Sequence, residues 1–240
     1  MGPTIQAGRV LARSFSVLSA RFGPLFGSVL LLYLPFLVGY ALLSTVPEAE
    51  TVGMVAVALG LLSFALLTPL ASAAVIRGVF LHLRGEEVGF GDCWRGLGAI
   101  WLRVILLAVG VGVLTTVGFF LCAVPGFILQ TALFVAIPAL VVERTGVGDA
   151  FNRSWSLTEG HRLPIFFLVL ALGVLSFALS YSAGFLMGYL GASATVIDVV
   201  TQVLQALLTA LQAVIAGVVY FDLREIREGL GLDDLAAVFD

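Results

Sequence analysis

All of the positive charge in this chain comes from arginine, and the arginines fall in alternate connections between long apolar segments. The 240 residues include 12 arginines and no lysine. A guanidinium group is costly to carry into hydrocarbon, so the arginines record which connections stayed on one side of a membrane. The pattern therefore predicts a polytopic helical membrane protein.

Long uncharged stretches supply the membrane-spanning helices. Hydrophobic residues make up 60% of the chain and charged residues 11%, whereas a soluble domain carries about 25% charged residues. A spanning helix needs about 20 apolar residues to cross roughly 30 Å of hydrocarbon. We therefore predict six spans, at 24–43, 52–76, 104–122, 127–142, 163–182 and 199–221.

A Pro-Gly turn is expected between the third span and the fourth. Residues 104–142 carry no charge and are too long for one crossing. Val124, Pro125 and Gly126 lie within this stretch, and Pro followed by Gly favours a tight turn. Pro138 falls inside the fourth predicted span, where it predicts a kink.

Six spans place every arginine on one side of the membrane. The arginines form four groups: Arg9, Arg13 and Arg21; Arg77, Arg84, Arg95 and Arg103; Arg144, Arg153 and Arg162; Arg224 and Arg227. The opposite connections carry only Glu48, Glu50 and Asp198. The positive-inside rule then predicts that both termini are cytoplasmic.

Similar short segments predict three repeat units in a single membrane domain, 1–223. Arg-Ser-Phe-Ser at 13–16 recurs as Arg-Ser-Trp-Ser at 153–156, and a weaker third copy begins at 91–94. Such spacing is typical of an internally duplicated architecture. The predicted units, each a hairpin of two spans, are 1–83, 84–144 and 145–223, and a short acidic cytoplasmic tail follows at 224–240.

The segment before each hairpin has the pattern of an amphipathic helix lying in the cytoplasmic interface. In the first, Leu11, Phe15, Leu18 and Phe22 share one face. Basic helices with an aromatic stripe are typical of helices immersed at the headgroup level. The interface or lipid-headgroup candidates are Arg9, Arg13, Arg21, Arg95, Arg103, Arg153, Arg162, Trp94, Trp101 and Trp155. Two interpretations stay open: these helices cap the bundle, or they recognise a specific lipid.

The sixth span carries a row of polar residues. Asp198, Gln202, Gln205, Thr209 and Gln212 recur at helical spacing and so share one narrow face. Unpaired polar groups in hydrocarbon cost several kcal/mol each, so this polar seam must face the bundle or a wet groove. It either bonds neighbouring helices or forms a polar pathway or headgroup groove.

Catalytic and metal-binding motifs are missing from the sequence. His82 and His161 are its 2 histidines, and neither has cysteine or carboxylate neighbours at ligand spacing. There is no phosphate-binding loop, nucleophile elbow or zinc-protease motif. We therefore expect no enzyme activity, no catalytic residues, no metal, no cofactor and no nucleic-acid partner.

Charged residues gather after the fourth span, and around them the sequence resembles a known family. Glu143, Arg144, Asp149 and Arg153 predict ion pairing between a loop and a helix start. The segments that carry the resemblance are 124–126, Pro138 with Glu143, 150–162, 220–224 and 228–229. They resemble the membrane domain attached to some bacterial glycerophosphoryl diester phosphodiesterases, which also occurs in stand-alone multi-pass proteins.

This resemblance implies a six-helix module of the bacterial inner membrane. It does not imply hydrolase activity, because the histidine and carboxylate constellation of the catalytic domain has no counterpart in this sequence. We expect a lipid-contacting scaffold or a subunit of a membrane complex, with membrane lipids and another protein as partners. The alternative is a transporter or lipid-translocating permease that uses the polar seam.

Overall fold

The computed structural model describes residues 7–43, 54–55, 58, 60 and 62–229. These residues form helices and no strands, and six helical segments among them are long and apolar enough to cross a membrane. The predicted class, an all-helical multi-pass membrane protein, is therefore confirmed. The three-unit repeat stays a prediction.

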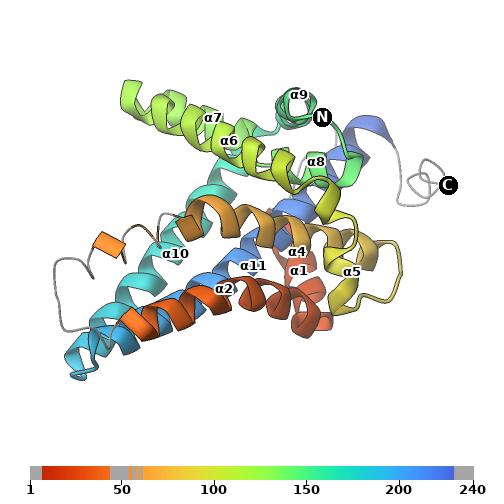
Figure 1. The fold of residues 1–240 in the computed structure, drawn as a ribbon. Coiled ribbons are helices and arrows are strands. Elements are labelled where there is room, and N and C mark those ends of the chain that lie inside the picture. The colour runs from red at the N-terminus through yellow and green to blue at the C-terminus, as the bar shows by residue number, and fades with distance from the viewer. Residues whose placement is uncertain (1–6, 44–53, 56–57, 59, 61, 230–240) are drawn as a thin grey trace.

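The helices are shown in Figure 1. In chain order they are α1 (Ala7–Ala20), α2 (Phe22–Leu43), a π-helical turn η1 (Ser63–Leu67), α4 (Thr68–Leu83), α5 (Phe90–Trp94), a 3-10 turn η2 (Leu97–Ala99), α6 (Trp101–Leu121), α7 (Ala123–Ala132), α8 (Ala136–Glu143), α9 (Val147–Thr158), α10 (Arg162–Tyr189) and α11 (Ala194–Glu228).

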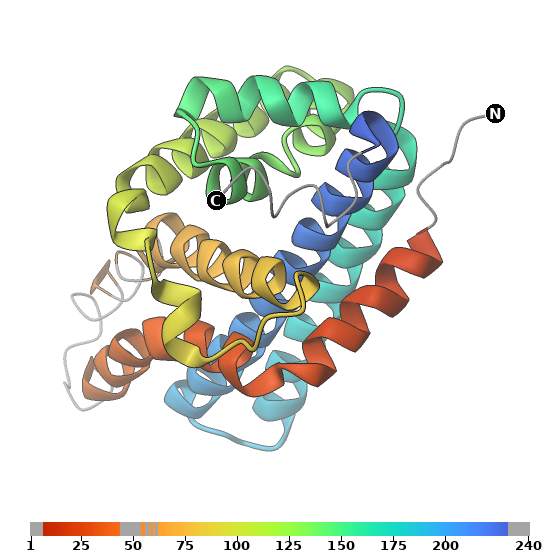
Figure 2. The same cartoon turned by 90° about the vertical axis from the view of Figure 1, so that its right-hand side faces the viewer.

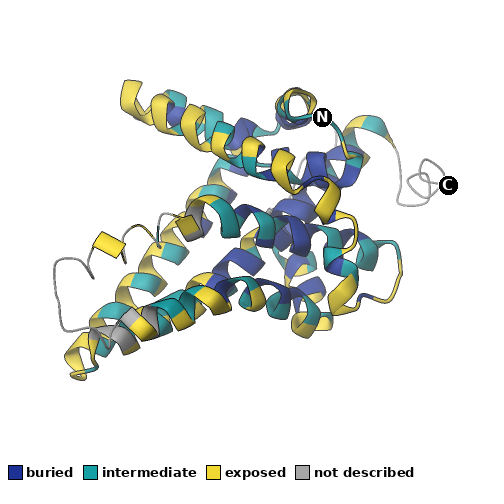
Figure 3. Ribbon diagram, in the orientation of Figure 1, coloured by how far each residue is buried: buried dark blue, intermediate teal, exposed yellow. Residues whose placement is uncertain are grey.

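Helices α4 and α11 form the centre of the bundle, whereas α6 and α7 project away from it (Figures 1 and 3). Small residues allow the central pair to approach: a Cβ built on Gly217 of α11 would lie 3.3 Å from Val79 of α4. Close backbone approach of this kind is how membrane helices gain packing energy. The outer faces of α6, α7 and α10 are mostly exposed, as expected for helices that face lipid or another protein.

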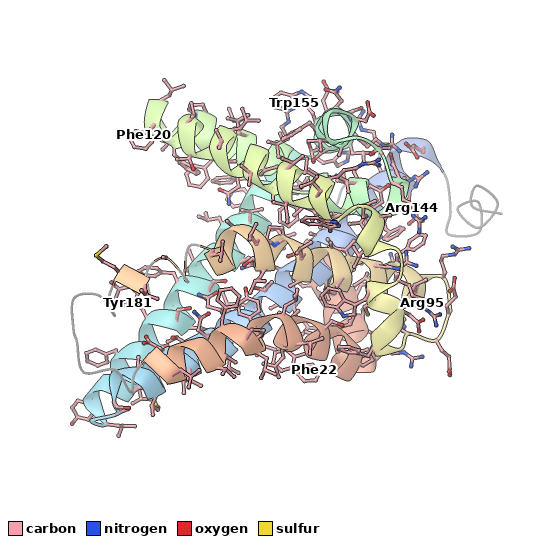
Figure 4. The ribbon with its side chains drawn as sticks, in the orientation of Figure 1. Phe22, Arg95, Phe120, Arg144, Trp155 and Tyr181 are labelled. Carbon is pink, nitrogen blue, oxygen red and sulfur yellow. The ribbon has the colours of Figure 1, made fainter. Side chains whose placement is uncertain are left out.

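The arginine-bearing connections lie at one end of the bundle, which we call the arginine end. Figure 4 places Arg95 and Arg144 there, opposite Phe120 and Tyr181. Figure 2 looks onto this end and shows α1, α5 and α9 arranged around it. An ion pair between α1 and α11, described below, shows that both terminal helices reach the same end, as an even number of crossings requires.

The second span ends later than predicted. The apolar helix suited to crossing continues to Leu83, not Ile76. It includes Arg77, which the prediction placed in the following loop. Hydropathy could not fix this boundary because apolar residues continue on both sides of it; most of 52–62 lies outside the described residues.

The fourth span is not one continuous helix, and the turn before it is not at Pro-Gly. The chain reverses at Cys122, whose backbone is extended (φ −173°, ψ 155°), and Pro125 lies in the first turn of α7, where a missing N–H costs little. A second break separates α7 from α8 at 133–135. Pro138 causes it, because a proline ring clashes with the carbonyl four residues earlier.

Helices occur at all three positions where amphipathic segments were predicted, but their packed faces differ from the aromatic stripes. In α1 the buried residues are Val10, Ser14, Val17 and Leu18, while Phe15 is 57% exposed. In α9 the buried residues are Ala150, Ser154, Leu157 and Thr158. The second segment is broken into α5 and η2. Helices α1 and α9 thus pack on the bundle through aliphatic and small residues, whereas Phe15 and Trp155 are exposed.

The last helix extends beyond the predicted end of the membrane domain. Helix α11 continues through Glu228 and ends at Gly229, whose positive φ (64°) suits a helix C-cap. The first residues of the predicted tail are therefore helical. Residues 230–240 of that tail, and the predicted external residues Glu48 and Glu50, lie outside the described part of the chain.

Candidate functional site

The polar seam lies on α11 and bonds to α10 at two points. The Gln205 amide donates to Ser180 Oγ at 3.0 Å, and the Gln212 amide donates to Ser176 Oγ at 2.9 Å. Hydrogen bonds between membrane helices contribute about 0.6 kcal/mol each. These glutamines therefore have helix–helix partners.

The other members of the polar seam differ in exposure. Thr209 is buried, Gln202 is half-buried and Asp198 is exposed near the turn between α10 and α11. Gln205 and Gln212, on either side of Thr209, are exposed as well, so exposure alternates along the seam. Asp198, near the start of α11, meets water or headgroups more readily than hydrocarbon.

A cleft of about 660 Å³ opens elsewhere, between α4, α6 and the α7–α8 segment. Its walls are mainly aliphatic, and its polar lining residues are Thr68, Ser72, Thr116 and Gln130. No member of the polar seam lines it. Its volume is within the roughly 300–1,000 Å³ typical of small-molecule sites, and its apolar walls suit an acyl chain better than a polar solute.

A network of charged and polar side chains joins α8, α9 and α11 at the arginine end. Glu143 accepts hydrogen bonds from Arg153 Nε at 2.7 Å and from the Tyr220 hydroxyl at 2.7 Å. Arg153 also pairs with Glu228, which accepts from Arg224 Nε at 2.8 Å. Ion pairing was predicted for Glu143, Arg144, Asp149 and Arg153 between a loop and a helix start; the pair observed joins Glu143, at the end of α8, to Arg153, within α9. We call these five residues the α8–α9–α11 lock.

The α8–α9–α11 lock balances its own charge, because two arginines face two glutamates. Burial alone would lower the pKa of Arg153, but its hydrogen bonds to Glu143 and Glu228 outweigh burial and raise that pKa. The guanidinium therefore stays charged at every physiological pH. Arg153, predicted as a headgroup contact, is instead committed to partners within the chain.

Helix α1 is fastened to the same end by a separate ion pair. Arg13 Nη1 lies 2.9 Å from Asp222 Oδ1, with the arginine side chain 33% exposed and the aspartate 15% exposed. A partly exposed pair of this kind contributes on the order of 1 kcal/mol. Its main effect is positional, since it joins the first helix to the last.

Two hydroxyl groups of α9 bond to the broken fourth span. In a continuous helix the Ala132 carbonyl would accept from the N–H of Ala136, but that N–H donates to Leu133 instead, at 3.1 Å. Ser154 Oγ donates to the freed Ala132 carbonyl at 2.7 Å, and Thr158 Oγ1 does so at 3.3 Å. Both hydroxyl residues are fully buried. They satisfy the carbonyl that the break leaves without a helical partner.

The remaining interface candidates lie around the arginine end without forming one site. Arg95 is 78% exposed and pairs with Asp92 at 2.9 Å, while the Arg162 guanidinium lies 4.3 Å from the centre of the Trp155 ring. Of the others, Arg9, Trp101 and Arg103 are exposed, and Arg21 and Trp94 are half-buried. The structure therefore does not bring the predicted headgroup residues together.

Sequence analysis missed the roles of Tyr220, Arg224 and Glu228. Their spacing of four residues places them on one face of α11, and this was the signal available. Nothing in the local pattern indicated that their partners would come from α8 and α9.

Within the described residues, no group of three or more histidine, cysteine, aspartate or glutamate side chains could hold a metal ion. Comparisons with family models, with curated proteins and with solved structures each found no match to this chain. We therefore infer the function from the contacts and the exposure of the described residues.

Proposed function

We propose that this chain is a non-enzymatic membrane protein that acts as a lipid-contacting scaffold or as a subunit of a membrane complex. We place its arginine end in the cytoplasm of a bacterial inner membrane, as the positive-inside rule and the family resemblance imply. One observation carries the proposal: two glutamines of the polar seam, Gln205 and Gln212, bond to serines on α10, and none of the seam lines the cleft.

The arginine end supports a scaffold role because its charges fasten helices to one another. Arg153 and Arg224 face Glu143 and Glu228, and Arg13 faces Asp222. A carboxylate already paired with arginine is a poor general base. These contacts make the arginine end a fixed platform on which another protein could dock.

The outer apolar faces of the bundle are the proposed surface for lipid or partner helices. Phe120 on α6 is 89% exposed, and Phe185 on α10 is 77% exposed. Large exposed apolar surfaces require a lipid or protein partner. An acyl chain in the cleft between α4 and α6 would extend the same contact into the bundle.

A transporter or lipid-translocating permease is the alternative, and one observation favours it. Gln205 and Gln212 are exposed on the bundle surface although each has a serine partner. A lipid headgroup following α11 could meet these amides in turn. That role requires the amides to exchange their serine partners for the moving headgroup.

Leucine substitution separates the two roles. Replacing Gln202, Gln205 and Gln212 together removes two interhelical bonds, so the scaffold role predicts a loss of about 1 kcal/mol in stability and weaker assembly. Gln202→Leu alone is the matched control, because no described hydrogen bond involves its side chain. Partner recovery and lipid flux would be measured in the same preparations. Loss of flux by a triple variant that still folds and assembles would favour the permease.

A further inference from the structure

A second, smaller pocket lies between α4 and α8 at the arginine end. Its volume is about 240 Å³, and three of its lining side chains are arginines: Arg77, Arg84 and Arg144. Glu86 is the carboxylate in the lining, and Val141 with Val142 forms part of the floor. The charged lining therefore carries three positive charges and one negative charge, a net +2.

Each arginine is held in place by a different contact. Arg77 Nε donates to the backbone carbonyl of Asp92 at 3.0 Å, which leaves the outer nitrogens of the guanidinium directed elsewhere. Arg84 lies 3.4 Å from Glu86 and 5.3 Å from the Phe80 ring.

The backbone conformation of Arg144 and its packing against Gly96 set the position of its side chain. Arg144 caps α8 with φ +52°, and it is the only non-glycine residue in the left-handed region among those described. That conformation is unfavourable for a residue with a side chain. A Cβ built on Gly96 would lie 3.0 Å from Arg144 Nη2, so a larger residue there would crowd the guanidinium.

The pocket brings together two arginines that have no ion-pair partner, beside Arg84, which pairs with Glu86. Arg77 and Arg144 repel each other, and neither forms an ion pair with a carboxylate in the described ranges, although Asp92 and Glu86 attract Arg77 from beyond ion-pair distance. Arg13, Arg153 and Arg224, by contrast, all have such partners. Like charges held close in a half-buried pocket are unfavourable unless an anion lies between them.

Guanidinium groups match the geometry of carboxylates and phosphates. Arginine binds phosphate through parallel N–H donors, and several arginines together are typical of phosphate recognition. We propose that the pocket of Arg77, Arg84 and Arg144 binds a phosphate group, carried either by an anionic phospholipid or by a soluble phosphate ester. The proposal deepens the lipid contact of the proposed function, and it rests on that contact only for the lipid as source.

The depth of the pocket is suited to a headgroup. Arg77 precedes the end of the Ala65–Leu83 span by six residues, so it lies about 9 Å inside that end of the helix. Long arginine side chains at such a level reach toward the interface, where lipid phosphates lie. The apolar floor at Val141 and Val142 would meet the glycerol and upper acyl region.

The test compares lipid retention by purified full-length variants. Wild-type protein in mild detergent would be mixed with phosphatidylglycerol and phosphatidylcholine of equal chain length, and bound lipid would be measured by native mass spectrometry. We expect phosphatidylglycerol to be preferred, and the preference to fall about tenfold or more in Arg77→Gln with Arg144→Gln, since each loses a charge-assisted hydrogen bond. Arg227→Gln, an exposed arginine at the same end of the bundle but outside the pocket, is the matched control.

Further arms identify the source of the phosphate. Competition by inorganic phosphate or glycerol phosphate at concentrations that displace phosphatidylglycerol supports a soluble ligand, whereas no competition supports the lipid. Arg144→Gln alone replaces an exposed side chain and covers the case in which the double variant does not fold. A folded Arg144→Gln protein with wild-type lipid preference, or an equal loss in Arg227→Gln, would overturn the proposal. Recovery of a protein partner is measured separately, so failure of the scaffold role would leave this result standing.

Discussion

Removing the Ser154 hydroxyl tests whether α9 stabilises the broken fourth span. Ser154→Ala deletes the 2.7 Å bond to the Ala132 carbonyl and leaves that carbonyl with Thr158 at 3.3 Å. The Thr158 hydroxyl also lies 2.9 Å from the carbonyl oxygen of residue 154 and 3.2 Å from that of residue 155, so its single hydrogen is shared among three acceptors. One neutral hydrogen bond contributes about 0.5–1.5 kcal/mol. Ser154→Ala should therefore lower the free energy of unfolding by about 1 kcal/mol.

Adding Thr158→Val should raise the loss to about 1–3 kcal/mol, because the buried carbonyl then has no side-chain donor. Two serines serve as matched controls. Ser156 lies on the same helix and is exposed, so Ser156→Ala should change stability by less than about 0.5 kcal/mol. Ser14 occupies the equivalent place in the first repeat copy, but its buried hydroxyl has no described partner, so Ser14→Ala should be neutral or stabilising.

The assay is unfolding of the purified protein by sodium dodecyl sulfate in mixed micelles, followed by far-ultraviolet circular dichroism. The expected order of stability is Ser14→Ala and Ser156→Ala near wild type, then Ser154→Ala, then the double variant. If Ser154→Ala and Ser156→Ala unfold at the same detergent fraction, the hydroxyl contact does not hold the break, and the role assigned to α9 is wrong.

Three further predictions concern orientation and packing. A membrane-impermeant maleimide added to intact cells should label the exposed Cys122 and not Cys93, because Cys93 is buried and that burial raises the pKa of its thiol. Labelling of Cys122 only in inside-out vesicles would show that the protein has the opposite orientation. Tyr220→Phe should cost about 1.5–3 kcal/mol in the same unfolding titration, because its hydroxyl donates to a carboxylate, and a loss below about 0.5 kcal/mol would contradict the lock. Gly126→Ala should lower the free energy of unfolding by about 1–3 kcal/mol, because a Cβ there would lie 2.5 Å from the Phe119 ring. Gly184 has open space around it, so Gly184→Ala should keep or raise stability. Equal effects of the two substitutions would refute the close approach of α6 and α7.

The number of spans could be predicted from the sequence, but their boundaries could not all be. Hydrophobic length sets how many helices cross, because each needs about 20 apolar residues. It does not set which residues of a longer apolar run are used. Arg77 was expected to end the second span, yet α4 continues through Leu83 because the guanidinium reaches the Asp92 carbonyl and a polar pocket. Tertiary contacts made the arginine acceptable within the helix.

Close helix approach was also beyond the sequence. Glycines four residues apart often mark such contacts, and Gly184 with Gly188 has that spacing. The structure leaves open space around both, whereas a Cβ on Gly118 would lie 3.0 Å from the Gly126 backbone across the α6–α7 turn. With 27 glycines in the chain, spacing alone cannot distinguish a contact from an outward face.

The arginine-end contacts were predictable only where the partners are near in sequence. Glu143 and Arg153 are separated by one loop, so their opposite charges indicated a pair. Tyr220 joins them from the last helix, and no periodicity in α11 specifies which element it will meet. Contacts of this kind depend on how helices pack, which hydropathy does not encode.

Segment 150–162 carries part of the family resemblance and several of the predicted headgroup residues. In the structure its residues have separate structural roles. Arg153 is part of the α8–α9–α11 lock, Ser154 and Thr158 bond the break in the fourth span, and Arg162 stacks on Trp155. Each residue supplies a partner for buried backbone or buried charge, because an unsatisfied polar group in a membrane protein costs several kcal/mol. A motif that solves packing problems needs no attached catalytic domain. Unpaired charge is the better guide to a ligand, and in this chain it directs attention to Arg77 and Arg144.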